Sequence, residues 1–219
     1  MTRTSENLSP ELHAYLVAHS TPVDEVLTDL AAETERLFPD HVGMQIAPEQ
    51  GLFLTLLTQL IGARNIVEVG TFTGYSSICL ARGLPDDGTL LACDVSEEWT
   101  AVARRYWQRA GVADRIDLRL APALDTLRAL PEEPQFDLAF IDADKESYIA
   151  YWEELVPRVR PGGVLLADNV FSHSRVLDPA QTAARVQAIR DFNVHARDDT
   201  RVDLVILPIG DGLTLARRR

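Results

Sequence analysis

Residues 68–76 read Glu68-Val-Gly70-Thr-Phe-Thr-Gly74-Tyr-Ser76, and they give the first indication of the fold. It follows the apolar run 65–69 and leads into a helical pattern, which predicts a strand, a glycine turn and a helix. The two glycines let the backbone pass close to a ligand. The spacing differs from the G-x-G-x-x-G dinucleotide fingerprint, and the sequence has no Gly-Lys-Ser/Thr phosphate loop.

The same alternation continues toward the C-terminus. Strands are expected at 65–69, 89–93, 116–120, 136–141, 163–167, 202–207 and 212–216, and helices at 76–82, 96–110, 124–130, 146–156 and 180–194. This order predicts an α/β fold with a doubly wound, mostly parallel sheet covered by helices on both faces. The closing hairpin makes the last strand antiparallel, so the seven-stranded sheet is mixed.

The first 45 residues have a different pattern, which predicts a helical N-terminal extension. Apolar residues recur there at helical spacing, and Ser20 or Thr21 is expected to cap the second helix, with Pro22 at its first position. A third helix is expected over 48–60. We expect residues 1–219 to form a single domain, in which the extension 1–45 contributes to the substrate site or to a dimer interface.

Composition narrows the class of protein. The chain has 219 residues, a net charge of −12 and only two cysteines, which excludes a disulfide framework and a cysteine-based zinc site. No apolar run is long enough to span a membrane, and the N-terminus lacks the apolar core of a signal peptide. These features predict a reduced, cytoplasmic protein without a membrane partner. The acidic charge disfavours a broad nucleic-acid surface.

Two acids predict the nature of the ligand at the strand tips. Glu68 precedes the glycine turn, where a carboxylate repels a pyrophosphate and favours a cationic group. Asp94 ends the second strand, where an acid accepts hydrogen bonds from ribose hydroxyls. An adenosine ligand with a cationic group and no phosphates, S-adenosylmethionine, suits both. Each acid also has a structural interpretation: Glu68 as a holder of loop amides, and Asp94 as a cap before Ser96.

Three further oxygen-bearing side chains follow neighbouring strands. Asp142 ends the fourth strand, and Asp168 and Asn169 end the fifth. Carboxylate and amide oxygens suit Mg²⁺, or Mn²⁺ or Ca²⁺, although these residues also suit helix caps and loop acids. Lys145 is the only lysine beside 20 arginines. A metal ion and a helix N-terminus would lower its pKa and make it a general base; a salt bridge with Asp144 or Glu146 is the structural alternative.

At this point the chain resembles the cation-dependent O-methyltransferases of the caffeoyl-CoA and catechol type. The resemblance runs from about His41 to the C-terminus, in the segments HVGMQIAPEQGLFL, EVGTFTGYSS, FIDADKESY, PGGVLLADNV and LPIGDGLTLARRR. It implies a class I methyltransferase fold, Rossmann-like, with S-adenosylmethionine as cofactor. It also implies a homodimer and a small aromatic substrate with hydroxyl groups.

The resemblance assigns roles residue by residue. It implies that Lys145 is the catalytic base and that Asp142, Asp168 and Asn169 bind the metal ion. The expected cofactor-binding residues are Met44, Ile46, Glu68, Gly70, Thr71, Gly74, Ser76, Asp94, Ala123, Asp142 and Tyr148. We also expect Tyr148 and the loop 171–179 to form substrate walls. Two departures from the family are Phe171-Ser172, where many relatives have Trp and a small residue, and Ala121 in place of a common glycine.

Methyl transfer to a catechol-like small molecule is therefore the expected reaction. A tRNA hydroxyuridine O-methyltransferase is the alternative within the same chemistry. A nicotinamide-dependent oxidoreductase is disfavoured by the missing third glycine and by Glu68. A non-catalytic binding module is disfavoured by the complete set of Asp142, Lys145, Asp168 and Asn169.

Overall fold

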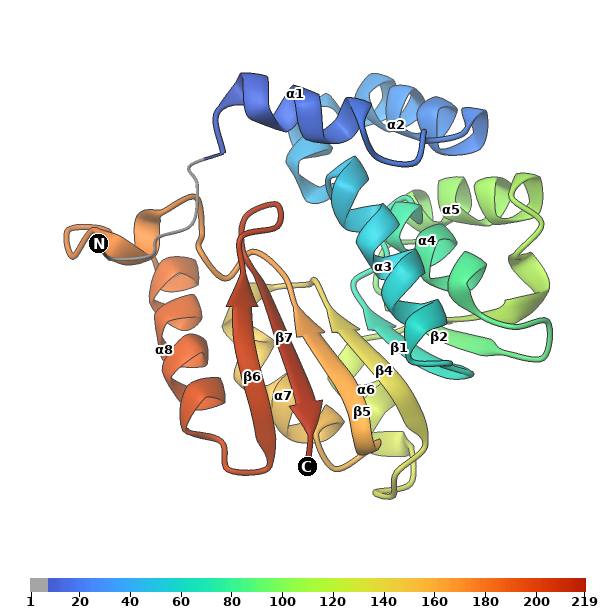
Figure 1. The fold of residues 1–219 in the computed structure, drawn as a ribbon. Helices are drawn as coiled ribbons and strands as arrows, with labels where there is room; N and C mark the ends of the chain where they lie inside the picture. Colours follow the sequence, from blue (N-terminus) through green and yellow to red (C-terminus); the bar gives the residue numbers. More distant parts are fainter. Residues whose placement is uncertain (1–7) are drawn as a thin grey trace.

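The computed structural model describes residues 8–219 and contains the expected mixed sheet (Figure 1). The seven strands lie in the order β3-β2-β1-β4-β5-β7-β6. Their bounds are β1 Asn65–Val69, β2 Thr89–Asp94, β3 Ile116–Leu120, β4 Phe136–Ile141, β5 Val159–Ala167, β6 Val202–Leu207 and β7 Leu213–Arg218. This confirms the expected fold class.

Strand direction places the sequence-predicted acids at one edge of the sheet. β1 pairs in parallel with β2 and β4, and β4 pairs in parallel with β5. β7 is antiparallel to both β5 and β6. The strand order reverses between β1 and β4, so their carboxyl ends open at a topological switch point, where ligands bind in such sheets.

Helices cover both faces because side chains of the central strands alternate between two apolar cores. Ile66 and Phe140 belong to the core under α3 (Pro48–Leu60), α4 (Tyr75–Gly83) and α5 (Glu97–Arg109). Val67 and Ile141 belong to the opposite core, under α6 (Ala123–Ala129), α7 (Tyr148–Leu155) and α8 (Ala184–Asp198). The central strands are thus buried on both sides, as expected for parallel strands.

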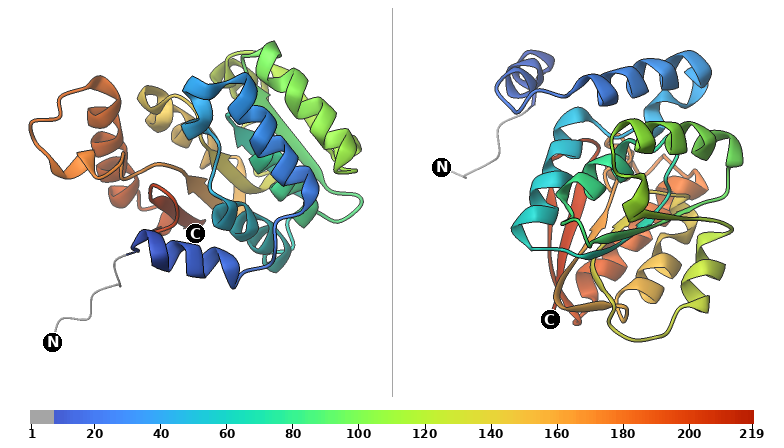
Figure 2. Two further views of the ribbon diagram at one scale, coloured as in Figure 1. Left: turned by 90° about the horizontal axis from the view of Figure 1, so that it is seen from above. Right: turned by 90° about the vertical axis from the view of Figure 1, so that its right-hand side faces the viewer.

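The N-terminal helices lie across the carboxyl end of the sheet rather than on either face (Figure 2). α1 (Pro10–Ala18) and α2 (Glu25–Leu37) are followed by the short helix η1 (Pro39–Met44). Residues 1–7 of the predicted extension lie outside the described residues. Within residues 8–219, the helices are all too short or too polar to cross a membrane.

Two helix starts differ from the expectation. α2 begins at Glu25 and not near Pro22, because the Asp24 carboxylate, rather than Ser20 or Thr21, accepts the N–H of Leu27 at 3.1 Å. α8 begins at Ala184 instead of residue 180. The side chain of Arg190 binds the carbonyl oxygens of Val176 and Gln181, which holds the preceding residues as a loop with η4 (Arg175–Leu177).

Two further short helical segments precede β3 and α7. η2 (Ala113–Arg115) precedes β3, and η3 (Lys145–Ser147) precedes α7. The helix expected at 146–156 is therefore a turn of 3-10 helix followed by α7. This turn places Lys145 directly after the tip of β4.

Candidate active site

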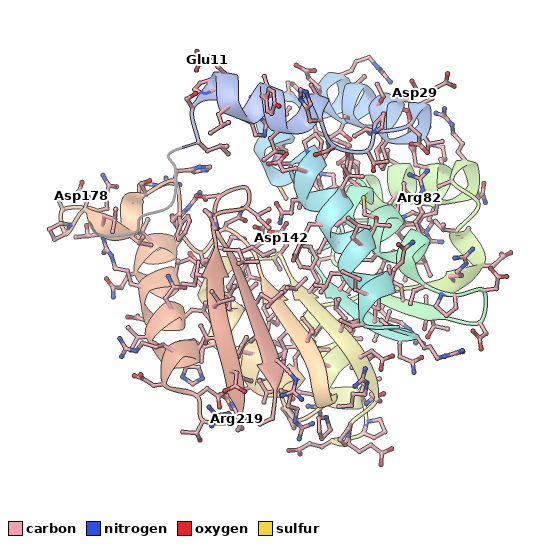
Figure 3. All side chains as sticks on the ribbon, in the orientation of Figure 1. Glu11, Asp29, Arg82, Asp142, Asp178 and Arg219 are labelled. Atoms are coloured by element: carbon pink, nitrogen blue, oxygen red, sulfur yellow. The ribbon has the colours of Figure 1, made fainter. Side chains whose placement is uncertain are left out.

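A cavity of about 520 Å³ opens at the carboxyl ends of the parallel strands. Asp142, directly after β4, lines this cavity, and Figure 3 shows it beside α3 and below α1. The cavity brings together residues from the N-terminal segment, from the tips of four strands and from the loop after β5. Of the sequence-predicted residues, it is lined by Met44, Ile46, Gly70, Thr71, Ser76, Asp94, Ala123, Asp142, Lys145 and Asn169.

Gly70 lets two strand tips meet at the switch point. Its φ is +94°, and a Cβ atom there would lie 2.0 Å from the carbonyl oxygen of Asp142. The N–H of Asp142 donates to the carbonyl oxygen of Val69 at 2.8 Å, which continues the parallel ladder to this point. A side chain at position 70 would therefore separate the cofactor-side turn from the tip of β4.

Asp94 has the structural role that its position allows, and it also lines the cavity. Its Oδ2 atom accepts the N–H groups of Thr71 at 3.0 Å and Phe72 at 2.8 Å, and its Oδ1 atom accepts the N–H of Ser96 at 2.8 Å. Asp94 thus holds the glycine turn and the start of α5 while it lines the cavity. A carboxylate in this position is also available to ribose hydroxyls.

Glu68 lies beneath the glycine turn and is fully buried. Its Oε2 atom accepts the hydroxyl of Ser77 at 2.5 Å and that of Thr71 at 3.4 Å, whereas Oε1 has no hydrogen-bond partner among the described residues. Burial raises the pKa of Glu68 to about 8, against the hydrogen bonds from Ser76 and Ser77. A buried carboxylate with one unpaired oxygen is a strong receptor for a cationic donor.

The N-terminal segment covers the glycine turn through aromatic and hydroxyl contacts. The ring of Phe72 lies 5.2 Å from that of Trp99 and 6.0 Å from that of Phe38. The buried hydroxyl of Thr34 donates to that of Thr73 at 2.9 Å, which joins α2 to the turn. Phe72 and Trp99 line the cavity, so the extension and the site form one packed unit.

Lys145 forms the centre of the acid–base end. Its Nζ atom donates to Oδ1 of Asp142 at 3.0 Å, to Oη of Tyr148 at 2.6 Å and to Oδ1 of Asn169 at 2.7 Å. Asn169 has a φ of +57°, a left-handed conformation that asparagine tolerates. Oxygens from the tips of β4 and β5 therefore converge on one cationic atom, and the predicted pairing of Lys145 with Asp144 or Glu146 is not observed.

Asp168 is buried at the tip of β5. Burial raises its pKa, and the neighbouring charge of Asp142 raises it further. The N–H of Asn169 donates to Asp168 Oδ1 at 2.7 Å. Two carboxylates in a site of low polarity favour a bound cation, because a cation removes the repulsion between them.

Four of the predicted site residues do not line the cavity: Glu68, Gly74, Asp168 and Tyr148. Tyr148 is fully buried below Lys145, and its hydroxyl donates to the carbonyl oxygen of Asp168 at 3.0 Å. It therefore supports Lys145 instead of forming the expected wall, which Tyr151, one helical turn later, provides. A Cβ atom at Gly74 would lie 2.7 Å from Nε1 of Trp107, so this glycine permits close packing of α5.

The loop after β5 forms the outer wall and is held in place. Ser172 and His173, which have positive φ values, line the cavity with Arg185 and Asp211. The N–H of His173 donates to Oδ1 of Asp211 at 2.6 Å. Arg190 binds four carbonyl oxygens of this loop through its guanidinium, those of Arg175, Val176, Asp178 and Gln181. The loop is thus an ordered wall.

Sequence reasoning did not identify Trp99, Tyr151 and Arg185 as lining residues. Trp99 has the spacing of a packing residue on α5, and Arg185 is one of 20 arginines, so neither carries a local signal. Both cysteines are free and buried, as expected, and burial raises the pKa of each thiol to about 12. Cys93 lies at the end of β2 and lines the cavity.

Groups of three or more His, Cys, Asp or Glu side chains placed to hold a metal ion do not occur in the part of the chain that the structure describes. The predicted metal-binding set contains two carboxylates and an amide, Asp142, Asp168 and Asn169. Asn169, the third member of this set, is an asparagine and so is not counted in groups of His, Cys, Asp and Glu. Asp142 and Asn169 both present an oxygen within 3.0 Å of Lys145 Nζ.

Comparison with known proteins gives one consistent relationship. A family model described as O-methyltransferase matches residues 17–219. "Probable caffeoyl-CoA O-methyltransferase 2" of Dictyostelium discoideum is 39% identical over 205 residues, 92% of this chain and 88% of that protein. "Catechol O-methyltransferase domain-containing protein 1" of Mus musculus is 42% identical over 222 residues, 98% of this chain and 84% of that protein.

The fold comparison agrees. The crystal structure of an O-methyltransferase from Bacillus cereus, in complex with SAH, superposes with a TM-score of 0.86. It is 36% identical and covers 95% of this chain and 97% of its own.

Proposed function

This chain belongs to the O-methyltransferase family and is an S-adenosylmethionine-dependent O-methyltransferase, and we propose that it methylates one hydroxyl of a catechol-like aromatic molecule with the aid of a divalent cation. The convergence of Asp142 and Asn169 oxygens on Lys145 carries this proposal. It brings a general base and two hard metal ligands together beside the cofactor turn.

The cofactor end suits S-adenosylmethionine. The unpaired Oε1 atom of buried Glu68 would accept the ammonium group of the methionine end, and Asp94 would bind the ribose. Gly70, Thr71 and Ser76 line the same side, Met44 and Ile46 would close over the methyl donor, and Ala123 would lie near the adenine. The sulfonium charge disappears during transfer, so an acid at the amine end stabilises binding without opposing the reaction.

The metal end suits a hard divalent cation such as Mg²⁺. Asp142, Asp168 and Asn169 would hold it, since carboxylate and amide oxygens are its usual protein ligands. When bound, S-adenosylmethionine supplies the methyl group, and the divalent cation supplies positive charge that favours the phenolate form of the acceptor.

Lys145 performs the proton transfer in this proposal. Its Nζ atom is held by three oxygens and is only partly exposed, so it meets the acceptor hydroxyl from a fixed position. Lys145 would take the phenolic proton as a neutral amine, a state in which Nζ has a free electron pair and donates to at most two of these three oxygens. Tyr148 remains a phenol, because burial raises its pKa, and it orients Lys145 from below. Much of the rate then comes from holding the two reactants in line.

The first experiment is methyl transfer from labelled S-adenosylmethionine to a panel of catechols and monophenols, with Mg²⁺ and with EDTA. We expect transfer to the catechols only, abolished by EDTA and restored by added Mg²⁺. Transfer that survives EDTA contradicts the metal requirement. Transfer to tRNA that contains hydroxyuridine and to none of the catechols would select the tRNA alternative.

We also propose that the protein is a homodimer, as the family resemblance implies. Apolar side chains are exposed on α3 and α1: Leu60 is 83% exposed, Leu56 is 56% exposed and Tyr15 is 60% exposed. Exposed apolar residues grouped on helices are common at subunit interfaces. Light scattering coupled to gel filtration measures the mass directly, and a mass near 24.3 kDa contradicts the dimer.

A further inference from the structure

A buried amide lies next to the acid–base end of the site. Gln50 is in the first turn of α3, only 1% of its surface is exposed, and its Nε2 atom has no hydrogen bond of normal geometry to any described residue. The carboxylate of Asp168 is the acceptor that this amide faces, at a geometry outside that of a normal hydrogen bond. An unsatisfied buried donor is costly, so its retention calls for an explanation.

The amide is confined on its other side by the turn between β6 and β7. A Cβ atom at Gly210 would lie 2.7 Å from Oε1 of Gln50. Gly210 has a φ of +53°, so glycine meets two requirements there, the backbone conformation and the space for the amide. Gln50 thus fills the space between this turn and the tip of β5.

The helix that carries Gln50 is fixed against α4. A Cβ atom at Gly51 would lie 2.8 Å from Sγ of Cys79, and the hydroxyl of Thr55 donates to the carbonyl oxygen of Cys79 at 2.8 Å. The two helices therefore pack closely next to Gln50. The position of its side chain is set by the packing of α3 on the sheet and not by solvent.

We infer that Gln50 is a positioning residue, whose Nε2 group donates to the Asp168 carboxylate and orients it toward the divalent cation. This inference rests on the proposed function, since it assumes that Asp168 binds a metal ion. The Oδ1 atom of Asp168 already accepts the N–H of Asn169, so the second oxygen is the one that Gln50 can orient. Metal-binding carboxylates usually have such outer partners, which fix their direction.

A neutral donor suits this position better than a charged one. A lysine or arginine beside Asp168 would reduce the negative charge that attracts the cation, whereas an amide orients the carboxylate and leaves its charge unchanged. The residue that approaches Asp142 and Asn169 is the cation Lys145, and the residue that approaches Asp168 is the neutral Gln50. Within the predicted metal-binding set, Asp142 and Asn169 therefore have a basic neighbour, whereas Asp168 has a neutral one.

Gln50→Met tests the role, because methionine retains the length of the side chain and removes the donor. Thr58→Val is the matched control: Thr58 is also buried on α3 and has an unpaired hydroxyl, but it contacts Gly83 of α4. Mn²⁺ affinity is measured by electron paramagnetic resonance, SAH affinity by calorimetry, and folding by circular dichroism. We expect Gln50→Met to weaken Mn²⁺ binding about tenfold and to leave SAH binding unchanged.

A second variant moves the amide without removing it. Gly210→Ala places a methyl group against Oε1 of Gln50, and Gly62→Ala is its control, because Gly62 has a similar φ of +61° and no atom within 4 Å of an added Cβ. Weaker Mn²⁺ binding in Gly210→Ala and in Gln50→Met, with both controls unchanged, supports the inference. Mn²⁺ affinity within twofold of the parent in folded Gln50→Met overturns it.

A crystal structure of Gln50→Met separates this inference from the proposed function. We expect the Asp168 carboxylate to adopt a different rotamer or several rotamers once the donor is absent. An unchanged Asp168 side chain overturns the positioning role, whatever the metal affinity. Failure of the parent protein to bind Mn²⁺ contradicts the metal requirement of the proposed function. It also contradicts the inference, which assumes that Asp168 binds a metal ion, whatever rotamer Asp168 adopts in the variant.

Discussion

The Nζ atom of Lys145 lies 2.7 Å from the Oδ1 atom of Asn169, although 24 residues separate them in the chain. The contact joins η3 to the tip of β5 and explains why Asn169 adopts a left-handed conformation with a φ of +57°. This backbone turn directs the amide oxygen toward Lys145. The Nζ atom of the predicted base therefore contacts two of the predicted metal ligands, Asp142 and Asn169.

Lys145→Arg separates charge from proton transfer. Arginine retains the positive charge beside Asp142 but does not give up its proton at neutral pH, so we expect turnover to fall at least about 100-fold. SAH affinity, measured by calorimetry, is expected to stay within about twofold of the parent. Arg104→Ala, on the exposed surface of α5, is the control. Normal turnover in Lys145→Arg would remove Lys145 from the role of base.

Glu68 couples cofactor binding to pH. Its pKa is about 8 in the unliganded protein, and an ammonium ligand favours the carboxylate, so binding below pH 8 releases a proton. Cofactor affinity should therefore rise with pH up to about 8. Calorimetry at pH 7 in two buffers of different ionisation enthalpy measures the proton count. Glu68→Gln should release none and bind at least about tenfold more weakly; equal proton release by both proteins contradicts the assignment.

The same residue affects stability in the absence of cofactor. Between pH 4.5 and 8 the folded state retains a proton on Glu68 that the unfolded state loses, so the free energy of unfolding falls as pH rises through this window. The contribution of Glu68 is fully present below pH 4.5 and lost above pH 8. Denaturant unfolding of parent and Glu68→Gln should show a difference that changes by about 1.4 kcal/mol per pH unit at most. A pH-independent difference would contradict the raised pKa.

Gly70→Ala and Gly62→Ala separate backbone strain from steric overlap. Both glycines have positive φ values, +94° and +61°, but only the Cβ atom at position 70 would meet backbone, the carbonyl oxygen of Asp142 at 2.0 Å. We expect Gly62→Ala to cost about 1 kcal/mol and Gly70→Ala about 2–4 kcal/mol of the free energy of unfolding. Equal costs in urea denaturation would show that the close approach of β1 and β4 is not required.

Arg190→Met should loosen the substrate wall selectively. Arg190 binds the carbonyl oxygens of Arg175, Val176, Asp178 and Gln181, and its loss leaves the loop held by fewer contacts. We expect KM for the phenolic substrate to rise severalfold and proteolysis within 172–183 to accelerate, with SAH affinity unchanged. Arg197→Met, whose ion pair with Asp198 is exposed, is the control. An unchanged KM would show that the loop does not contact the acceptor.

The strands and the positions of their terminal acids were predictable because both depend on neighbouring residues in the chain. The expected bounds of β1, β3, β4 and β6 agree with the structure, since each strand is a short segment rich in Val, Ile, Leu or Phe. Asp94, Asp142 and Asn169 then lie at one edge because parallel strands end at the same edge of a sheet. The same local pattern placed Gly70 beside them, at the edge where the cavity opens.

The environments of the individual side chains were not predictable. Tyr148 and Tyr151 are one helical turn apart, yet Tyr148 is buried below Lys145 and Tyr151 lines the cavity. The burial of Glu68, which raises its pKa to about 8, depends on the packing of α4. Gln50 has no local signal at all, because its contacts with Asp168 and Gly210 join segments more than 100 residues apart.

Local sequence patterns were enough to predict the mixed α/β sheet, the glycine turn and the edge at which the acids gather. Hydrophobic periodicity and turn chemistry act over a few residues, so each of these features depends on a short segment of the chain. The oxygens that Lys145 contacts, the tyrosine that supports it and the amide that faces Asp168 depend instead on the tertiary structure. Those relationships depend on how distant helices pack on the sheet, and packing is set by the whole core rather than by any one segment.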